Sequence, residues 1–83
     1  MSSQERLQIK GRLIERKQKR EEFKISIRGL IRDLRRTLDP YNEIEDLDID
    51  YCVRAVLSLQ TAQASYKAVQ REIRQLENDL GED

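Results

Sequence analysis

The chain has 83 residues, of which 37% are hydrophobic and 39% are charged. This length allows at most one domain, residues 1–83, and the low apolar content disfavours a sheet-based core or a buried substrate cavity. The 16 Lys and Arg residues balance the 16 Asp and Glu residues, so net charge by itself identifies no partner.

The cysteine content and the N-terminus indicate where the chain works. One Cys excludes an intrachain disulfide, which is typical of proteins in a reducing compartment. The N-terminal residues contain no apolar stretch of the kind that secretion needs. No apolar run approaches the roughly 20 residues that span a bilayer. We therefore expect a cytoplasmic protein that does not act at a membrane.

The first predicted element is a long helix over residues 3–38. Ser2 and Glu5 have the spacing of a capping box, which marks a helix start. Residues that favour helix then continue to Leu38. Asp39 precedes Pro40, and the residue before a proline is disfavoured in helical geometry, so we expect the helix to end there.

An acidic connector over residues 39–48 separates this helix from a second one, predicted over residues 49–80. Asn42 and Glu45 are expected to cap a short turn inside the connector. Asp46 or Asp48 is a suitable N-cap for the second helix. Gly81 is a natural stop.

Apolar spacing predicts how the second helix packs. Steps that alternate between three and four residues select only apolar or aromatic residues, which is a heptad stripe that requires a partner helix at a shallow crossing angle. These positions are Cys52, Ala55, Leu59, Ala62, Tyr66, Val69, Ile73, Leu76 and Leu80.

The first helix carries a matching stripe, and folding the chain at the connector brings the two stripes into register. The sequence therefore predicts an all-α, coiled-coil-like antiparallel two-helix hairpin, in which Leu30 meets Leu59 and Phe23 meets Tyr66. We call the joint stripe the seam. Its positions in the first helix are Ile9, Leu13, Arg16, Arg20, Phe23, Ile27, Leu30, Leu34 and Thr37, with Leu38 alongside.

Arg16 and Arg20 interrupt the apolar seam, opposite Ile73 and Val69. In one interpretation their aliphatic stems cover the seam while their guanidinium groups reach acceptors at its rim, such as Glu72 or Glu77. In the other, they bind phosphate or acidic residues of another subunit, because an unpaired buried arginine is costly.

A second set of apolar residues lies off the seam and is a candidate second interface: Leu7, Ile14, Ile25 and Leu57. Gly11 and Gly29 share a helix face with the first three, and close approach of another helix would explain why glycine is tolerated there. We expect two hairpins to pair into a four-helix bundle, or one hairpin to dock on another helical protein. The alternative is that these are scattered surface residues with no role.

Charge is segregated along the chain. Residues 1–36 hold 12 basic and 5 acidic residues, a net charge of +7, whereas residues 37–50 hold six acidic residues and no basic one. A basic stripe can follow a phosphate backbone, although no aromatic residue interleaves it and no nucleic-acid-binding motif is present. The candidate contacts to phosphate or to a protein partner are Lys10, Arg16, Lys17, Arg20, Lys24 and Arg28.

The residues needed for common catalytic or cofactor chemistry are missing. There is no His, no Gly-rich phosphate loop and no common zinc pattern. The alternating acids from Asp46 resemble the start of a calcium loop, but Tyr51 and Leu57 occupy the positions that need Gly and Glu. Cys52 is interpreted as a small core residue. We expect no catalytic residue, no bound metal and no cofactor, and hence no enzyme.

The sequence thus favours a non-enzymatic interaction or adaptor protein that acts by helix packing, with itself as a homodimer or with another helical protein. The alternative is a small nucleic-acid-associated accessory protein, of the kind found in phages or plasmids, that uses the basic first helix. A third possibility is a coiled-coil arm that folds fully only on its partner.

Overall fold

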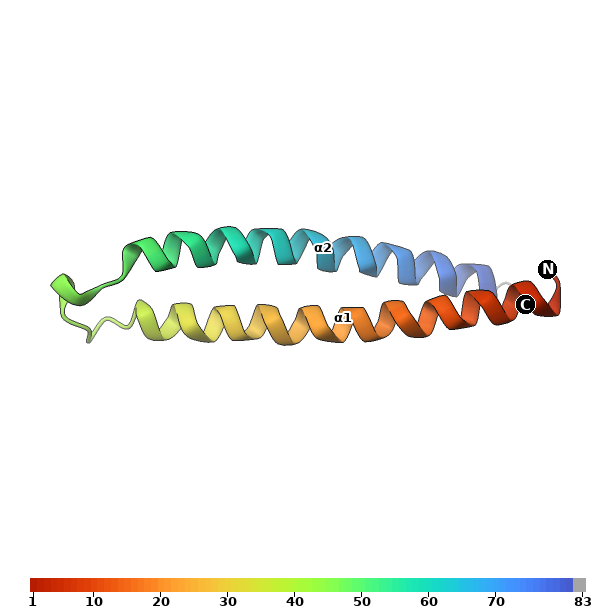
Figure 1. Cartoon of the computed structure of the whole chain (residues 1–83), viewed down its shortest axis with the longest axis horizontal. Helices are drawn as coiled ribbons and strands as arrows, with labels where there is room; N and C mark the ends of the chain where they lie inside the picture. Colours follow the sequence, from red (N-terminus) through yellow and green to blue (C-terminus); the bar gives the residue numbers. More distant parts are fainter. Residues whose placement is uncertain (82–83) are drawn as a thin grey trace.

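The computed structural model describes residues 1–81 and shows an antiparallel pair of long helices (Figure 1). Helix α1 spans Ser3–Thr37 and helix α2 spans Ile49–Gly81, and between them the 3₁₀ turn η1 spans Ile44–Asp46. No strand occurs among these 81 residues. The all-α helical hairpin predicted from the sequence is confirmed.

Helix α1 begins and ends with specific hydrogen bonds. At its start the hydroxyl of Ser2 accepts a hydrogen bond of 3.1 Å from the backbone N–H of Glu5, which satisfies one of the free donors of the first turn. At its end the side-chain amide of Asn42 donates to the carbonyls of Arg36 and Thr37, at 3.0 and 3.1 Å. Asn42 therefore caps α1, and the expectation that it caps the turn in the connector is wrong.

The start of α2 is defined by Asp48. Its carboxylate oxygen Oδ1 accepts a hydrogen bond of 3.0 Å from the backbone N–H of Tyr51, while its carbonyl accepts from Cys52 N–H at 3.2 Å. Asp48 is thus the N-cap residue of α2. Asp46, the alternative considered from the sequence, lies in η1 instead.

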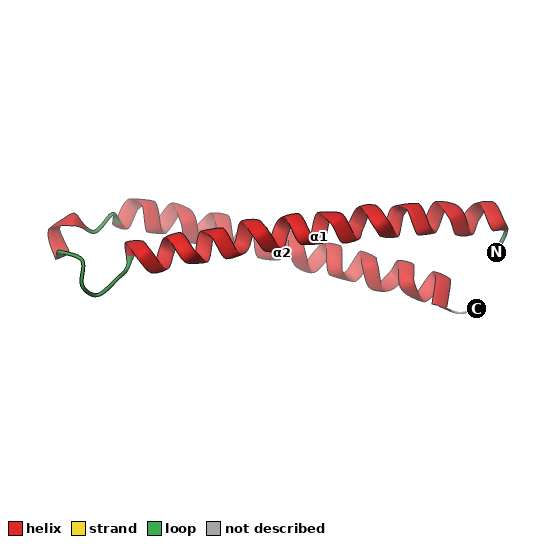
Figure 2. Ribbon diagram, turned by 90° about the horizontal axis from the view of Figure 1, so that it is seen from below, coloured by secondary structure: helices red, strands yellow, loops and turns green. Residues whose placement is uncertain are grey.

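The hairpin is a thin rod of 63 × 16 × 15 Å in which the two helices cross at a shallow angle (Figure 2). Its radius of gyration is 18.7 Å. A compact domain of this length would have a radius of gyration of about 12 Å. With only two helices, most residues face solvent, so any further burial has to come from another chain.

The core is a single row of side chains between the helices. The fully buried residues all belong to the seam of α2, whereas every seam position of α1 from Ile9 to Thr37 is partly exposed. Near the turn the buried residues Cys52 and Ala55 are small, whereas Val69, Ile73 and Leu76 in the second half of α2 are large. The buried residues are Cys52, Ala55, Val69, Ile73 and Leu76.

Burial is deepest where α1 presents its two arginines. Ile73 is 2% exposed and Val69 5% exposed, and these are the residues that the seam register places opposite Arg16 and Arg20. The register therefore places the aliphatic stems of the arginines over the seam, with Nη1 of Arg16 3.9 Å from Glu72 and Nη1 of Arg20 2.9 Å from Gln70.

Candidate interaction surfaces

Among residues 1–81, two ion pairs join the helices in the half of the hairpin away from the connector. Arg16 lies 3.9 Å from Glu72, and Lys17 lies 3.6 Å from Glu77. The first pair agrees with the rim interpretation of Arg16. Glu77, in contrast, pairs with Lys17 and not with an arginine. Because these side chains are about half exposed, each pair contributes roughly 0–1 kcal/mol to the stability of the hairpin. The pairs mainly favour this register of the two helices.

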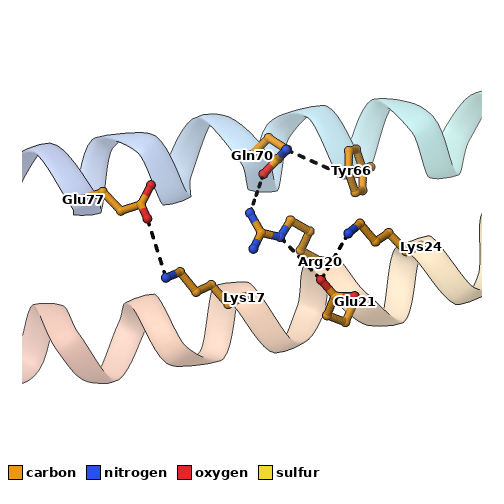
Figure 3. Close-up of polar contacts among 7 residues, drawn as sticks. All are labelled: Lys17, Arg20, Glu21, Lys24, Tyr66, Gln70 and Glu77. Atoms are coloured by element: carbon orange, nitrogen blue, oxygen red, sulfur yellow. Dashed lines mark hydrogen bonds and ion pairs between the residues drawn. The ribbon is translucent and has the colours of Figure 1, made fainter.

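Arg20 is held by a neutral acceptor. Its Nη1 donates a hydrogen bond of 2.9 Å to Oε1 of Gln70 across the hairpin, and the Gln70 amide reaches the Tyr66 hydroxyl at 3.5 Å (Figure 3). Arg20 Nε lies 3.8 Å from Glu21, which is also 3.4 Å from Lys24. That Nε is buried and makes no hydrogen bond among residues 1–81.

These contacts occupy four of the six side chains that the sequence offers to phosphate. Arg16, Lys17, Arg20 and Lys24 each have an intramolecular partner. A phosphate would compete with these partners, so the stripe is less available than its sequence suggests. Of the six, Lys10 and Arg28 make no hydrogen bond or ion pair within the described chain.

The four residues of the predicted second interface do not form one patch. All are exposed by 56% or more. At about 100° per residue, Leu7, Ile14 and Ile25 lie on the side of α1 that faces away from α2. Leu57 instead lies on α2 and borders a groove between the two helices, together with Phe23 of α1 and Ala62. The grouping made from the sequence therefore combines two surfaces that point in different directions.

The two glycines of α1 are open in the isolated hairpin. A methyl group added at Gly11 would meet no atom within 4 Å, and at Gly29 it would meet only the end of the Arg32 side chain at 3.7 Å. Helix α2 therefore does not use them for close approach.

Helix α2 has a continuous uncharged surface that faces away from α1. Residues 55–66 contain no Asp, Glu, Lys or Arg, in a chain in which 39% of residues are charged. We define the outer face of α2 by six exposed positions that fall within about 100° of helical arc. They are Ile49, Val53, Val56, Leu57, Gln60 and Ala64. The four largest aliphatic side chains among them are 52–56% exposed.

A shallow groove extends this apolar surface toward α1. It has a volume of about 400 Å³, and its apolar wall on α1 includes Ile31, which is 42% exposed. Val56 joins the groove to the outer face of α2. The groove is lined by Ile27, Ile31, Val56, Leu59, Gln60 and Gln63.

A cluster of arginines occupies the end of α1 next to the connector. Four arginines, with Ile31 and Asp39, line a second groove of about 480 Å³: Arg28, Arg32, Arg35 and Arg36. Arg36 is paired with Asp33 at 2.6 Å, whereas the other three make no ion pair among residues 1–81. Only Arg28 of this cluster is among the contacts predicted from the sequence. The other three arginines can be recognised in the sequence because the spacing of all four places them on one side of the helix.

No group of three or more His, Cys, Asp or Glu side chains among residues 1–81 is arranged to hold a metal ion. Neither α1 nor α2 contains a segment that is long and apolar enough to cross a membrane.

Comparison with known proteins gives no family assignment. No protein-family model, no curated protein and no solved structure shows a significant match to the chain.

Proposed function

We propose that the protein is a non-enzymatic interaction module that works in the cytoplasm by packing a helix face against another helix. The observation that carries this proposal is the outer face of α2, where exposed aliphatic residues coincide with a stretch that has no charged residue. Charged residues are depleted at the cores of protein interfaces, and contiguous apolar patches mark such sites.

The exposed area of the hairpin supports the same conclusion. The chain of 9.9 kDa exposes 6598 Å². A compact monomer of that mass exposes roughly 5,200 Å², so the hairpin has an excess of about 1,400 Å². A standard interface buries about 800 Å² on each partner, so one helix-packing contact of ordinary size fits within this excess.

The test is the mass of the assembled protein, measured by light scattering on a sizing column at low and high salt. We expect more than one chain per particle under both conditions, because apolar packing is only weakly screened. Leu57→Asp should give a single chain with its helical circular dichroism largely retained. Ile25→Asp is the matched control, since it places the same charge on α1 at a residue that is 74% exposed and faces away from α2.

Two results would contradict the proposal. One is a wild-type protein that stays a single chain at all concentrations and captures no helical protein. The other is a Leu57→Asp variant whose mass equals that of the wild type.

One observation favours a second candidate function, that of a small nucleic-acid-associated protein. Arg28, Arg32 and Arg35 line one groove without an ion pair in the described chain, and arginine is suited to binding phosphate. Affinity for nucleic acid would fall steeply as salt rises, because each phosphate contact releases a counterion. Measuring binding to duplex DNA over a salt series separates this function from helix packing.

A further inference from the structure

The charged residues that flank the outer face of α2 are ordered by sign. Before the uncharged stretch come the acidic residues of the connector and of the first turn of α2, ending with Asp46, Asp48 and Asp50. The basic residue Arg54 also precedes the stretch, but it lies about 60° of helical arc outside the outer face. After it, three of the four basic residues of α2 continue the same arc, namely Lys67, Arg71 and Arg74. All of these positions are exposed. The surface is thus acidic, then apolar, then basic along the axis of the helix.

The acidic residues that α2 carries near its basic end, Glu72, Glu77 and Asp79, lie outside the helical arc of the three basic residues. Glu72 pairs with Arg16 across the hairpin, about 100° of arc from Arg71. The three basic side chains therefore form an uninterrupted positive surface. Lys67, Arg71 and Arg74 make no ion pair with another residue of the described chain.

We propose that the outer face of α2 binds the same face of a second copy of this chain, with the two α2 helices antiparallel. The inference rests on the proposed function and names its partner and orientation. A two-fold axis that reverses the helix direction places the acidic end of each face against the basic end of the other, and one apolar segment against the other. The result is a layer of four helices, with the two α2 helices at its centre and both α1 helices on the outside.

The spacing of the charges fits one register. When Leu57 of one chain lies beside Gln60 of the other, Val53 lies beside Ala64 and Asp50 beside Lys67. Asp50 and Lys67 are each about 13 Å from the two-fold axis at 1.5 Å per residue. The connector then extends past Asp50 toward Arg71 of the other chain. One apolar contact (Val53 with Ala64), one contact of Leu57 with the side chain of Gln60 and one ion pair therefore coincide on each side of the axis.

Other arrangements use the same surface less well. A parallel pairing would set the three basic residues against their own copies and the acidic residues likewise, which is repulsive. Packing through the groove of α1 would bring the unpaired arginines Arg28 and Arg35 of two chains together. Nucleic acid would be repelled by the acidic end of the face and would leave its aliphatic centre exposed.

The experiment uses charge reversal at both ends of the face. K67E/R71E reverses the basic end, and D46K/D50K reverses the acidic end. Each variant alone should show a dimer dissociation constant raised about tenfold or more, because attractive contacts become repulsive. About 0.5 M salt should partly restore each dimer. Mixing the two variants should give a heterodimer, and the combined four-site variant should again form a homodimer, since both changes restore opposite charges.

Two controls accompany these variants. K10E/R12E changes the net charge as much as K67E/R71E does, but on exposed positions of α1, and should leave the dissociation constant unchanged. Circular dichroism of every variant verifies that the helices form, which matters for D46K/D50K because a lysine in the first turn of α2 opposes the helix dipole. Asp48 is left intact because it caps α2.

The outcomes separate the arrangement from the function on which it rests. If the reversed variants keep the wild-type dissociation constant, or if their mixture forms no heterodimer, the antiparallel pairing is wrong. If Leu57→Asp is then still a single chain, helix packing stands with another partner. If Leu57→Asp also keeps the wild-type mass, the proposed function fails as well. A single-chain wild type that binds duplex DNA through Lys67 and Arg71 would overturn both.

Discussion

Arg20 and Gln70 form a hydrogen bond of 2.9 Å across the hairpin, at a seam position where a heptad pattern requires an apolar residue. The guanidinium group is only partly satisfied, because its buried Nε has no hydrogen-bond partner in the described chain. The stem of Arg20, by contrast, covers Val69. The aliphatic stem of Arg20 therefore stabilises the hairpin, whereas the burial of its charged group lowers the stability.

This division predicts opposite effects for two substitutions of Arg20. Arg20→Leu keeps an apolar side chain over Val69 and removes the poorly satisfied group, so it should raise the free energy of unfolding by about 1 kcal/mol. Arg20→Ala removes the stem as well and should lower it by about 1 kcal/mol. Urea unfolding followed by circular dichroism at a fixed chain concentration measures both. A lower stability for Arg20→Leu would show that the hydrogen bond to Gln70 outweighs the desolvation of Arg20.

Ile73 should be the most sensitive position of the seam, because it is 2% exposed. Ile73→Ala should lower the free energy of unfolding by about 2 kcal/mol, at the lower end for buried isoleucine because a two-helix core can partly close around the gap. Ile14→Ala makes the same chemical change at a position 59% exposed and shares any gain in helix propensity. It should change the stability by about 0.5 kcal/mol or less. Equal losses for the two variants would contradict the seam as the core.

Periodicity explains why the hairpin and its register are predictable from the sequence. Each seam position of α2 is apolar, so one pairing of the helices buries both stripes, and Arg16 reaches Glu72 in that pairing. Periodicity does not predict that Arg20 donates its hydrogen bond to Gln70, because a long side chain has several acceptors within reach at the rim. The sequence also does not show that Leu57 and Ile25 lie on different surfaces, because helical spacing orders residues around one helix, whereas the relative orientation of two helices is known only from the fold.

Asp48 should account for much of the stability of the first turn of α2. Asp48→Ala removes the acceptor of the Tyr51 N–H and should lower the free energy of unfolding by about 1 kcal/mol. Glu45→Ala removes one negative charge from η1, which has no side-chain cap hydrogen bond, and is the matched control. Thermal unfolding of the two variants at equal concentration is the measurement. A loss of the same size in both would mean that charge near the helix end matters and the capping hydrogen bond does not.

Substitutions of the two glycines of α1 test which side of the hairpin contacts a partner. A methyl group at Gly11 meets open space in the hairpin, so Gly11→Ala should raise the free energy of unfolding by about 0.5–1 kcal/mol through helix propensity alone. Gly29→Ala should behave similarly, since only the flexible end of Arg32 lies nearby. If α2 forms the interface, both variants keep the wild-type assembled mass. If either variant dissociates while gaining helicity, a helix approaches the glycine side of α1, and the pairing of α2 with α2 is excluded.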